Sequence, residues 1–161
     1  MRFLNRLDRL TGQITSTAQW LALPLILLLF LQWPLRDIIR CCSRGANDLG
    51  QIVFALFVAV SVTAATRAGT HLASDALAHH YSARTRHRLR QLGAAIAVLP
   101  WALFIVIASE PFVLASVLER ESFADTFNPG YFIIKAALWL MAILMIAQAA
   151  LDIFRPYSDD A

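Results

Sequence analysis

Two histidines and an aspartate are the first candidates for a functional site, because their side chains can bind metal ions. His71, Asp75 and His79 recur every four residues, so on a helix they would line one face. Imidazole and carboxylate groups in that arrangement can bind zinc or another divalent ion. No fourth ligand is obvious, and the alternative is a set of structural polar groups bonded to one another or to a partner. We expect the structural role, with no bound metal.

The second candidate is the adjacent pair Cys41-Cys42, which are the only cysteines. Their spacing excludes a disulfide framework and every CxxC-type metal or redox motif. We expect ordinary thiols, and a vicinal redox pair is the alternative. Haem bound between helices would need histidine ligands inside apolar runs, and all four histidines lie outside them.

Glu110 and Lys135 are the third candidate. Glu110 is the only acidic residue well inside an apolar run, and an ionisable residue there marks a functional or recognition site. Lys135 begins the next run, and on antiparallel neighbouring helices its long side chain would reach toward Glu110. We predict that the two pair and that breaking the pair destabilises the fold. Acid–base catalysis needs two neighbouring titratable groups, and the sequence offers only these, so we do not expect an enzyme.

The composition indicates that these residues sit in a membrane protein. The chain has 161 residues, of which 58% are hydrophobic and 16% charged, whereas soluble domains have roughly 45–50% and about 25%. Four apolar runs are long enough to cross a bilayer as helices, which takes about 20 residues each. We predict an all-α integral membrane fold with a single four-span domain. The spans are placed at residues 18–35, 49–66, 92–118 and 131–154.

Polar segments at the membrane surface complete the predicted fold. Apolar residues at positions 3, 4, 7 and 10 share one helical face, which predicts a short interfacial helix before the first span. The first apolar run exceeds the 7–15 residues of a signal-peptide core, so we expect it to be retained. Within the second span, Ala55, Ala59 and Thr63 lie four apart, which suits close helix packing in lipid.

The longest polar interval, residues 67–91, is predicted to be a cytoplasmic elbow. It holds five of the fourteen basic residues and all four histidines, with Asp75 as its only acid. Ser82 is a good helix N-cap, so we expect a helix to start there and run directly into the third span. Its first turns carry four arginines, against the preference of the helix dipole, and anionic lipid headgroups would offset that cost. These headgroup-binding residues are Arg84, Arg86, Arg88 and Arg90.

The distribution of basic residues predicts the orientation. With the N-terminus inside, nine Lys and Arg residues lie on the cytoplasmic side and five on the other. The positive-inside rule therefore places both termini in the cytoplasm. Because the basic residues flank membrane spans, lipid is the expected partner and nucleic acid is not.

The order of these features resembles the small membrane subunit of tripartite ATP-independent periplasmic (TRAP) transporters, the DctQ-like family. The likeness covers about residues 14–155, and its motifs are specific in combination rather than singly. The residues that carry it are Asp48 at the start of span two, Arg67-x-Gly69-x-His71, the step from Leu72 to Asp75, Ser82-x-Arg84-x-Arg86, Glu121-Ser122 and Lys135.

The resemblance implies a bacterial inner-membrane protein without a catalytic site or cofactor of its own. Such a subunit works as a scaffold with a much larger membrane subunit, which carries the substrate and sodium sites. A periplasmic binding protein delivers the substrate, expected to be an organic acid such as a dicarboxylate, keto acid or sugar acid. Two alternatives are a stand-alone small transporter or channel and a membrane redox protein using Cys41-Cys42. Structural or interface roles fall to Asp48, Arg67, His71, Asp75, Glu110, Glu121, Ser122 and Lys135.

Overall fold

The computed structural model describes residues 2–38, 44–68 and 81–154. These residues form helices and one irregular loop, and their only extended pairing is an isolated antiparallel bridge between Ser122 and Pro129. The helical elements in chain order are α1 (Arg2–Ala18), η1 (Gln19–Leu21), α2 (Ala22–Ile38), α3 (Arg44–Ala68), α5 (Ala83–Gly93), η2 (Ala94–Val98), α6 (Leu99–Leu118) and α7 (Tyr131–Phe154).

Four helical stretches of the described residues are long and apolar enough to cross a membrane, which confirms the predicted fold class. The predicted N-terminal helix forms, and it continues through η1 into α2 without a loop. The third and fourth stretches end at Leu118 and Phe154, where the sequence placed the ends of those spans. The four stretches are Leu4–Phe30, Gly45–Ala68, Ala83–Leu118 and Tyr131–Phe154.

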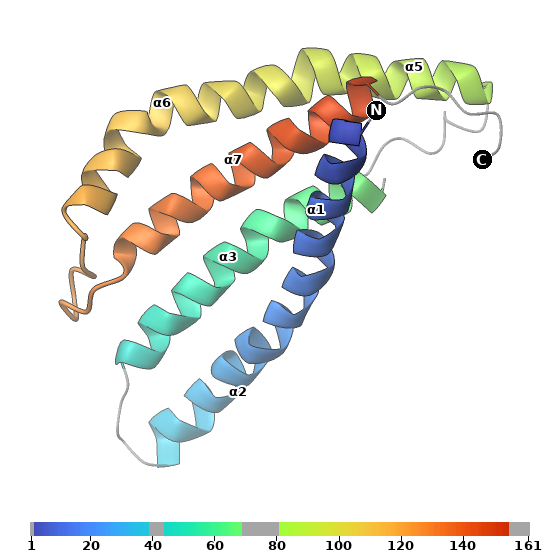
Figure 1. Cartoon of the computed structure of the whole chain (residues 1–161). Helices are drawn as coiled ribbons and strands as arrows, with labels where there is room; N and C mark the ends of the chain where they lie inside the picture. Colours follow the sequence, from blue (N-terminus) through green and yellow to red (C-terminus); the bar gives the residue numbers. More distant parts are fainter. Residues whose placement is uncertain (1, 39–43, 69–80, 155–161) are drawn as a thin grey trace.

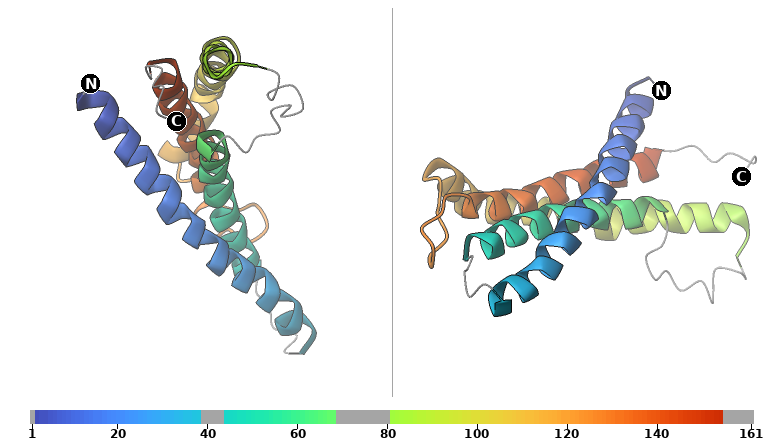
Figure 2. Two further views of the ribbon diagram at one scale, coloured as in Figure 1. Left: turned by 90° about the vertical axis from the view of Figure 1, so that its right-hand side faces the viewer. Right: turned by 90° about the horizontal axis from the view of Figure 1, so that it is seen from below.

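The helices lie side by side in a row rather than in a closed bundle. In Figure 1 the order across the row is α6, α7, α3 and α2. The packing agrees with that order, since α7 contacts both α6 and α3, and α2 contacts α3. Helix α1 crosses α3 and also reaches α7 near the N-terminal end of the row, as the turned views in Figure 2 show.

Small side chains allow α3 and α7 to approach closely. Ala59 and Thr63 on α3 are only 2% and 0% exposed, so the packing face predicted for the second span is confirmed. Helix α7, which packs against α3, likewise has small buried residues, Ala142 and Ala149. Lipid gives little hydrophobic drive for helices to associate, so such close van der Waals contact is a main source of helix pairing in membranes.

Two prolines explain the local changes in helix geometry. Pro24 has no N–H for the carbonyl of Trp20, and the chain forms the 3₁₀ turn η1 just before it. Pro100 follows the π-helical turn η2, in which the N–H of Leu99 bonds to the carbonyl of Ala94, five residues back. Both breaks are absorbed within a continuing helix, so the spans remain unbroken.

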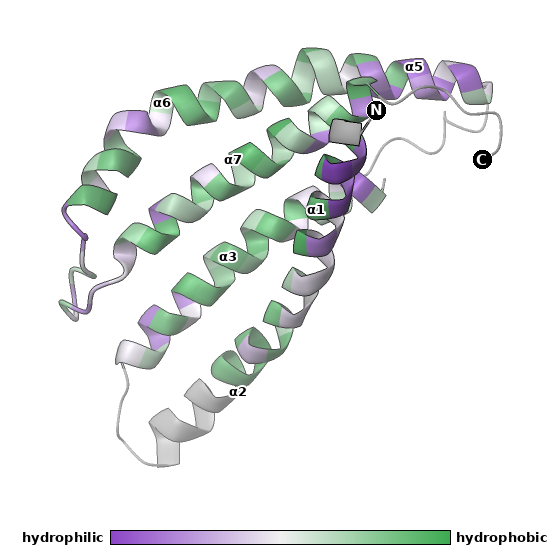
Figure 3. Ribbon diagram, in the orientation of Figure 1, coloured by the Kyte–Doolittle hydropathy of each residue, from purple (hydrophilic) through white to green (hydrophobic). Residues whose placement is uncertain are grey.

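Most apolar surface of the row faces outward. Within the apolar parts of the four stretches, the share of residues buried inside the chain is 18%, 22%, 11% and 33% in chain order. Figure 3 shows hydrophobic residues along the lengths of the helices and hydrophilic ones gathered toward their ends. The polar groups that could form a site are therefore concentrated at the two ends of the row.

Candidate functional site: polar clusters at the two ends of the helix row

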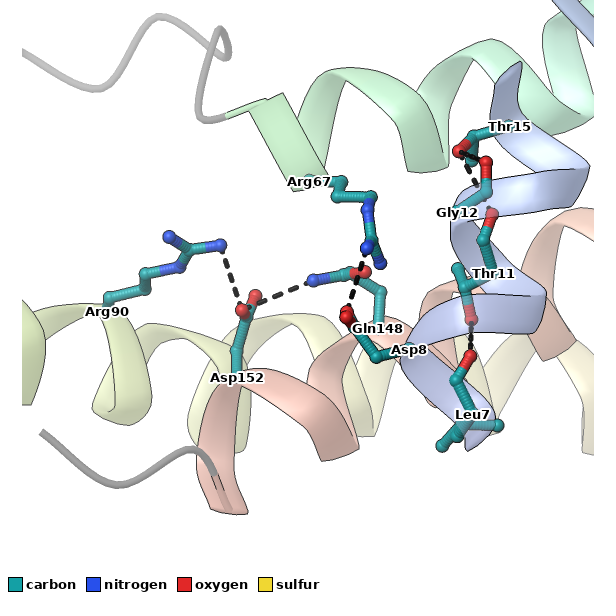
Figure 4. Close-up of polar contacts among 9 residues, drawn as sticks. All are labelled: Leu7, Asp8, Thr11, Gly12, Thr15, Arg67, Arg90, Gln148 and Asp152. Atoms are coloured by element: carbon teal, nitrogen blue, oxygen red, sulfur yellow. Dashed lines mark hydrogen bonds and ion pairs between the residues drawn. The ribbon is translucent and has the colours of Figure 1, made fainter. Parts of the chain in front are cut away.

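An ion pair joins α1 to α3 at the end of the row that holds the N-terminus. Arg67, in the last turn of α3, places Nη2 2.8 Å from Asp8 Oδ1 (Figure 4). Gly12 makes room for this contact, since a Cβ there would lie 3.2 Å from the same nitrogen. Both side chains are about one-third exposed. The pair therefore fixes how α1 crosses α3 more than it adds stability.

A second ion pair joins α5 to α7 at the same end. Arg90 Nη2 lies 2.8 Å from Asp152 Oδ1, and the aspartate side chain is only 6% exposed. Gln148, one turn earlier on α7, donates its amide to the same oxygen at 3.2 Å. Gln91 adds a hydrogen bond to the carbonyl of Ile153 at 3.0 Å. These contacts hold the start of the long α5–α6 helix against the end of α7.

Together these residues form what we name the elbow-end cluster. Figure 4 shows its side chains gathering from α1, α3, α5 and α7. Two of its buried atoms, Arg67 Nη1 and Gln148 Oε1, have no hydrogen-bond partner among the described residues. One is a donor and the other an acceptor, so a water molecule or a small side-chain rotation would satisfy both. Its members are Asp8, Arg67, Arg90, Gln148 and Asp152.

At the opposite end, Asp48 anchors the loop between α6 and α7. Its carboxylate accepts hydrogen bonds from Thr126 Oγ1 at 2.6 Å and from Asn128 Nδ2 at 3.0 Å. Asp48 is 7% exposed, and it lies near the start of α3. A buried carboxylate held by two donors ties the loop to α3. The residue that the resemblance singled out is thus a structural contact between helix and loop.

Lys135 and Glu121 form the second anchor of this loop. The ammonium of Lys135 bonds to Glu121 Oε2, which also accepts from Ser116 Oγ at 2.6 Å. The lysine, 13% exposed, lies 3.9 Å from the ring centroid of Phe112 in a cation–π contact. The bonds from Lys135 and then Ser116 hold the pKa of the Glu121 carboxyl below its ordinary value of 4.5. We name these contacts the loop cluster. Its members are Asp48, Ser116, Glu121, Thr126, Asn128 and Lys135.

The predicted pair between Glu110 and Lys135 is wrong. Lys135 is in the first turns of α7, level with the loop, and Glu121 meets its ammonium there. Glu110 lies eight residues before the end of α6, roughly 12 Å along the axis. Its side chain is exposed, and no hydrogen bond or ion pair joins it to another described residue. Phe112 and Glu121 together leave the lysine only 13% exposed, so its charge is satisfied without Glu110.

The start of the third span follows the prediction closely. Ser82 caps α5, with its hydroxyl accepting from the N–H of Thr85 at 3.3 Å. The helix then continues through η2 into α6. The four arginines expected to bind headgroups are all exposed. Arg90, however, also forms an ion pair with Asp152. The headgroup role of Arg84, Arg86 and Arg88 stays a prediction.

Several expected residues carry no structural assignment. His71, Asp75 and the Cys41-Cys42 pair lie outside the described residues. Ser122 is exposed and takes part in the bridge with Pro129. No group of three or more metal-binding side chains occurs within residues 2–38, 44–68 and 81–154.

An open groove of about 510 Å³ lies beside the Asp8–Arg67 pair. It is lined by Asn5, Arg6, Asp8, Arg9, Gly12, Gln13, Ser16 and Arg67.

Asp8, Gln148 and Asp152 have roles that reasoning from the sequence missed. Gln148 and Asp152 stand four apart in the second half of a helix whose only other charged residue is Lys135 near its start, which was a usable signal for one polar patch. Asp8 carried a weaker signal, because one acid among several arginines in an amphipathic helix has many possible partners. The loop partners Thr126 and Asn128 carried none, since ordinary loop residues show no pattern before the loop is folded.

The fold and these clusters define an all-α, multi-pass membrane protein whose buried charged groups bind other groups of the same chain. The sequence matches the family described as "Tripartite ATP-independent periplasmic transporters, DctQ component" over residues 25–159. The chain belongs to that family, as its resemblance predicted, and is thus a transporter component. No curated protein and no solved structure was found to match it.

Proposed function

We propose that this chain is the scaffold subunit of a tripartite transporter that imports an organic acid. It works with a large membrane subunit, which carries the substrate and ion sites, and with a periplasmic binding protein. An ion gradient drives transport through the large subunit, so this chain needs no cofactor and performs no catalysis. The family match over residues 25–159 supports this division of labour.

The observation that carries the proposal is how the charges are used. Arg67, Arg90 and Lys135 are each engaged with a carboxylate of the same chain. These pairs lie at the ends of the row, where they fix one helix or loop against another. A transport pathway would instead need polar groups facing a route across the membrane. Between the ends, the helices consist mainly of hydrophobic residues (Figure 3), and many of these are exposed.

Glu110 is the exception that favours an assembled partner. On insertion scales, a charged side chain at the centre of a membrane helix costs about 2.5–3.5 kcal/mol. Glu110 is exposed and forms no ion pair with a described residue, so the isolated chain leaves this cost in place. A second membrane subunit that places a cation or hydrogen-bond donor against the carboxylate would offset it. The stand-alone channel or transporter offers no comparable compensation.

The orientation completes the proposal. Both termini and the elbow end face the cytoplasm of a bacterial cell, and the loop cluster faces the periplasm. The basic residues Arg86 and Arg88 then meet anionic headgroups of the inner leaflet. A membrane-impermeant thiol reagent should label Cys41 and Cys42 in intact cells. Labelling only after the inner membrane has been opened would contradict this orientation.

Affinity purification tests the assembly directly. The tagged chain, extracted from membranes in a mild detergent, should retain the large membrane subunit in a fixed ratio. A matched preparation in which the tag is carried by an unrelated four-span protein should not. If the chain purified alone under every extraction condition while the large subunit was present in the membrane, the scaffold role would be wrong.

A further inference from the structure

Helix α6 carries an exposed row of residues with the spacing of a helix–helix seam. Leu103, Ile107, Glu110, Leu114 and Val117 follow one another at intervals of four and three residues. The four apolar members are between 39% and 69% exposed, and Glu110 is exposed too. A repeat of this kind is how one helix presents knobs and holes to another. We name these five residues the Glu110 row.

The packing of α6 on α7 leaves this row uncovered. Trp139 on α7 donates its indole N–H to Ser109 Oγ at 3.0 Å, so Ser109 faces α7. Each residue turns about 100° around the helix, which directs Glu110 away from that contact. The buried residues of α6 are Ala102, Val113 and Ser116, and all three lie on the Ser109 side. Helix α6 also stands at the edge of the row in Figure 1, with no helix beyond it.

Two hydrogen-bond acceptors without a described partner lie within one helical turn of each other on α6. One is the Glu110 carboxylate. The other is the backbone carbonyl of Ile107, which loses its usual donor because Pro111 has no N–H. In a membrane, backbone polar groups need a partner within protein or water. Lipid chains supply none, so this site calls for a donor-rich side chain from another helix.

We infer that the Glu110 row docks one membrane-spanning helix of the large subunit, with an arginine or lysine at the depth of Glu110. This rests on the proposed function, to which it adds the docking face and its chemistry. A second copy of this chain fits poorly, because a symmetric contact would bring two Glu110 side chains together. Lys135 does not serve as the cation, since it is already paired with Glu121.

The neighbouring row on α6 provides a matched control. Phe104, Ala108, Pro111, Ala115 and Leu118 have the same spacing and are also exposed. This row contains no charged side chain, so it lacks the carboxylate on which the docking argument depends. Residues one position apart, such as Ile107 and Ala108, lie within about 1.5 Å of each other along the helix axis and face directions about 100° apart.

Site-specific photo-cross-linking tests the docking face. A photoreactive residue is placed at Ile107, Ala108, Leu114 or Ala115 of the full chain, in cells that also make the large subunit. Positions 107 and 114 should give several-fold more cross-linked large subunit than 108 and 115. The cross-linked peptide should contain an arginine or lysine within one helical turn. Equal or reversed yields, or a peptide without a basic residue, would overturn the inference.

A binding measurement tests the charge itself. The labelled chain is titrated with purified large subunit in detergent micelles, as the wild type, Glu110→Leu and Ala108→Leu. Polar contacts between membrane helices are worth about 0.6–1.7 kcal/mol, so Glu110→Leu should weaken binding about three- to twentyfold. Ala108→Leu should leave it unchanged. Unchanged binding by Glu110→Leu would show that the carboxylate is not part of the contact.

The two failures can be told apart. If the chain and the large subunit bind but cross-links arise from α1 or α2, the scaffold role stands and the Glu110 row is the wrong face. If they do not associate at all, both the proposed function and the docking face are wrong.

Discussion

Removing either partner of the Arg90–Asp152 pair should have unequal effects on stability. Arg90 is 46% exposed, whereas Asp152 is 6% exposed. After Asp152→Leu, the arginine can turn toward water or lipid headgroups. After Arg90→Met, the carboxylate stays buried with only the Gln148 amide as a described partner. Stranding a buried charge is the costlier change.

The expected magnitudes follow from those environments. Breaking a fully buried pair costs about 3–5 kcal/mol, and exposed pairs are worth about 0–1 kcal/mol. Arg90→Met falls between these limits, at about 2–3 kcal/mol, because Gln148 still solvates the carboxylate. Asp152→Leu should cost less, about 1–2 kcal/mol, because Arg90 can turn outward while only the Gln148 amide loses its acceptor. For a chain of this length, 1 kcal/mol shifts the thermal midpoint by about 2–4 °C, so the two variants should differ by several degrees.

The shift in thermal midpoint is measured by heating each variant in detergent and quantifying the remaining folded protein by size-exclusion chromatography. The control is Arg88→Met, which makes the same change on the same helix at an exposed position. The double variant Arg90→Met with Asp152→Leu should recover part of the loss from Arg90→Met, because the buried charge is gone. Equal losses for the two single variants, or additive losses in the double variant, would refute this reasoning.

Three further predictions concern the loop cluster and the helix packing. Since the pKa of Glu121 lies below 4.5, its pair should contribute fully above pH 4.5 and be lost as the pH falls through the lowered value. In Glu121→Gln, the thermal midpoint should therefore fall less steeply as the pH is lowered below 4.5. Asp48→Leu should cost about 1–3 kcal/mol by freeing two loop donors, against little change for the exposed Asp125→Ala, as read from thermal midpoints. Ala59→Leu should overpack α3 against α7 at a cost of about 1–3 kcal/mol, whereas Ala108→Leu should not, by the same assay.

Apolar length and local capping are the features that the sequence made predictable. Four runs of sufficient length fixed the number of candidate spans, because hydrocarbon thickness leaves few options. Ser82 marked a helix start, since few residue types satisfy free N–H groups so well. The spacing of Ala59 and Thr63 identified the face that packs. Each of these depends on neighbours in sequence, which a single chain displays directly.

The pairing of charges was less accessible. Lys135 was matched with Glu110 from their order along adjacent helices, but Glu121 lies nearer once the loop turns back. Arg90 looked like its neighbours in the arginine series, and only the position of α7 assigns it to Asp152. These contacts depend on helix rotation and loop path, and neither has a pattern readable from one sequence.

Reconstituted transport tests the central claim most directly. Proteoliposomes containing the large subunit, with its binding protein and an imposed ion gradient, are compared with and without this chain. A third set contains this chain alone. We predict organic-acid uptake only when the chain and the large subunit are both present, and none from the chain alone. Saturable uptake by the chain alone would contradict the scaffold account.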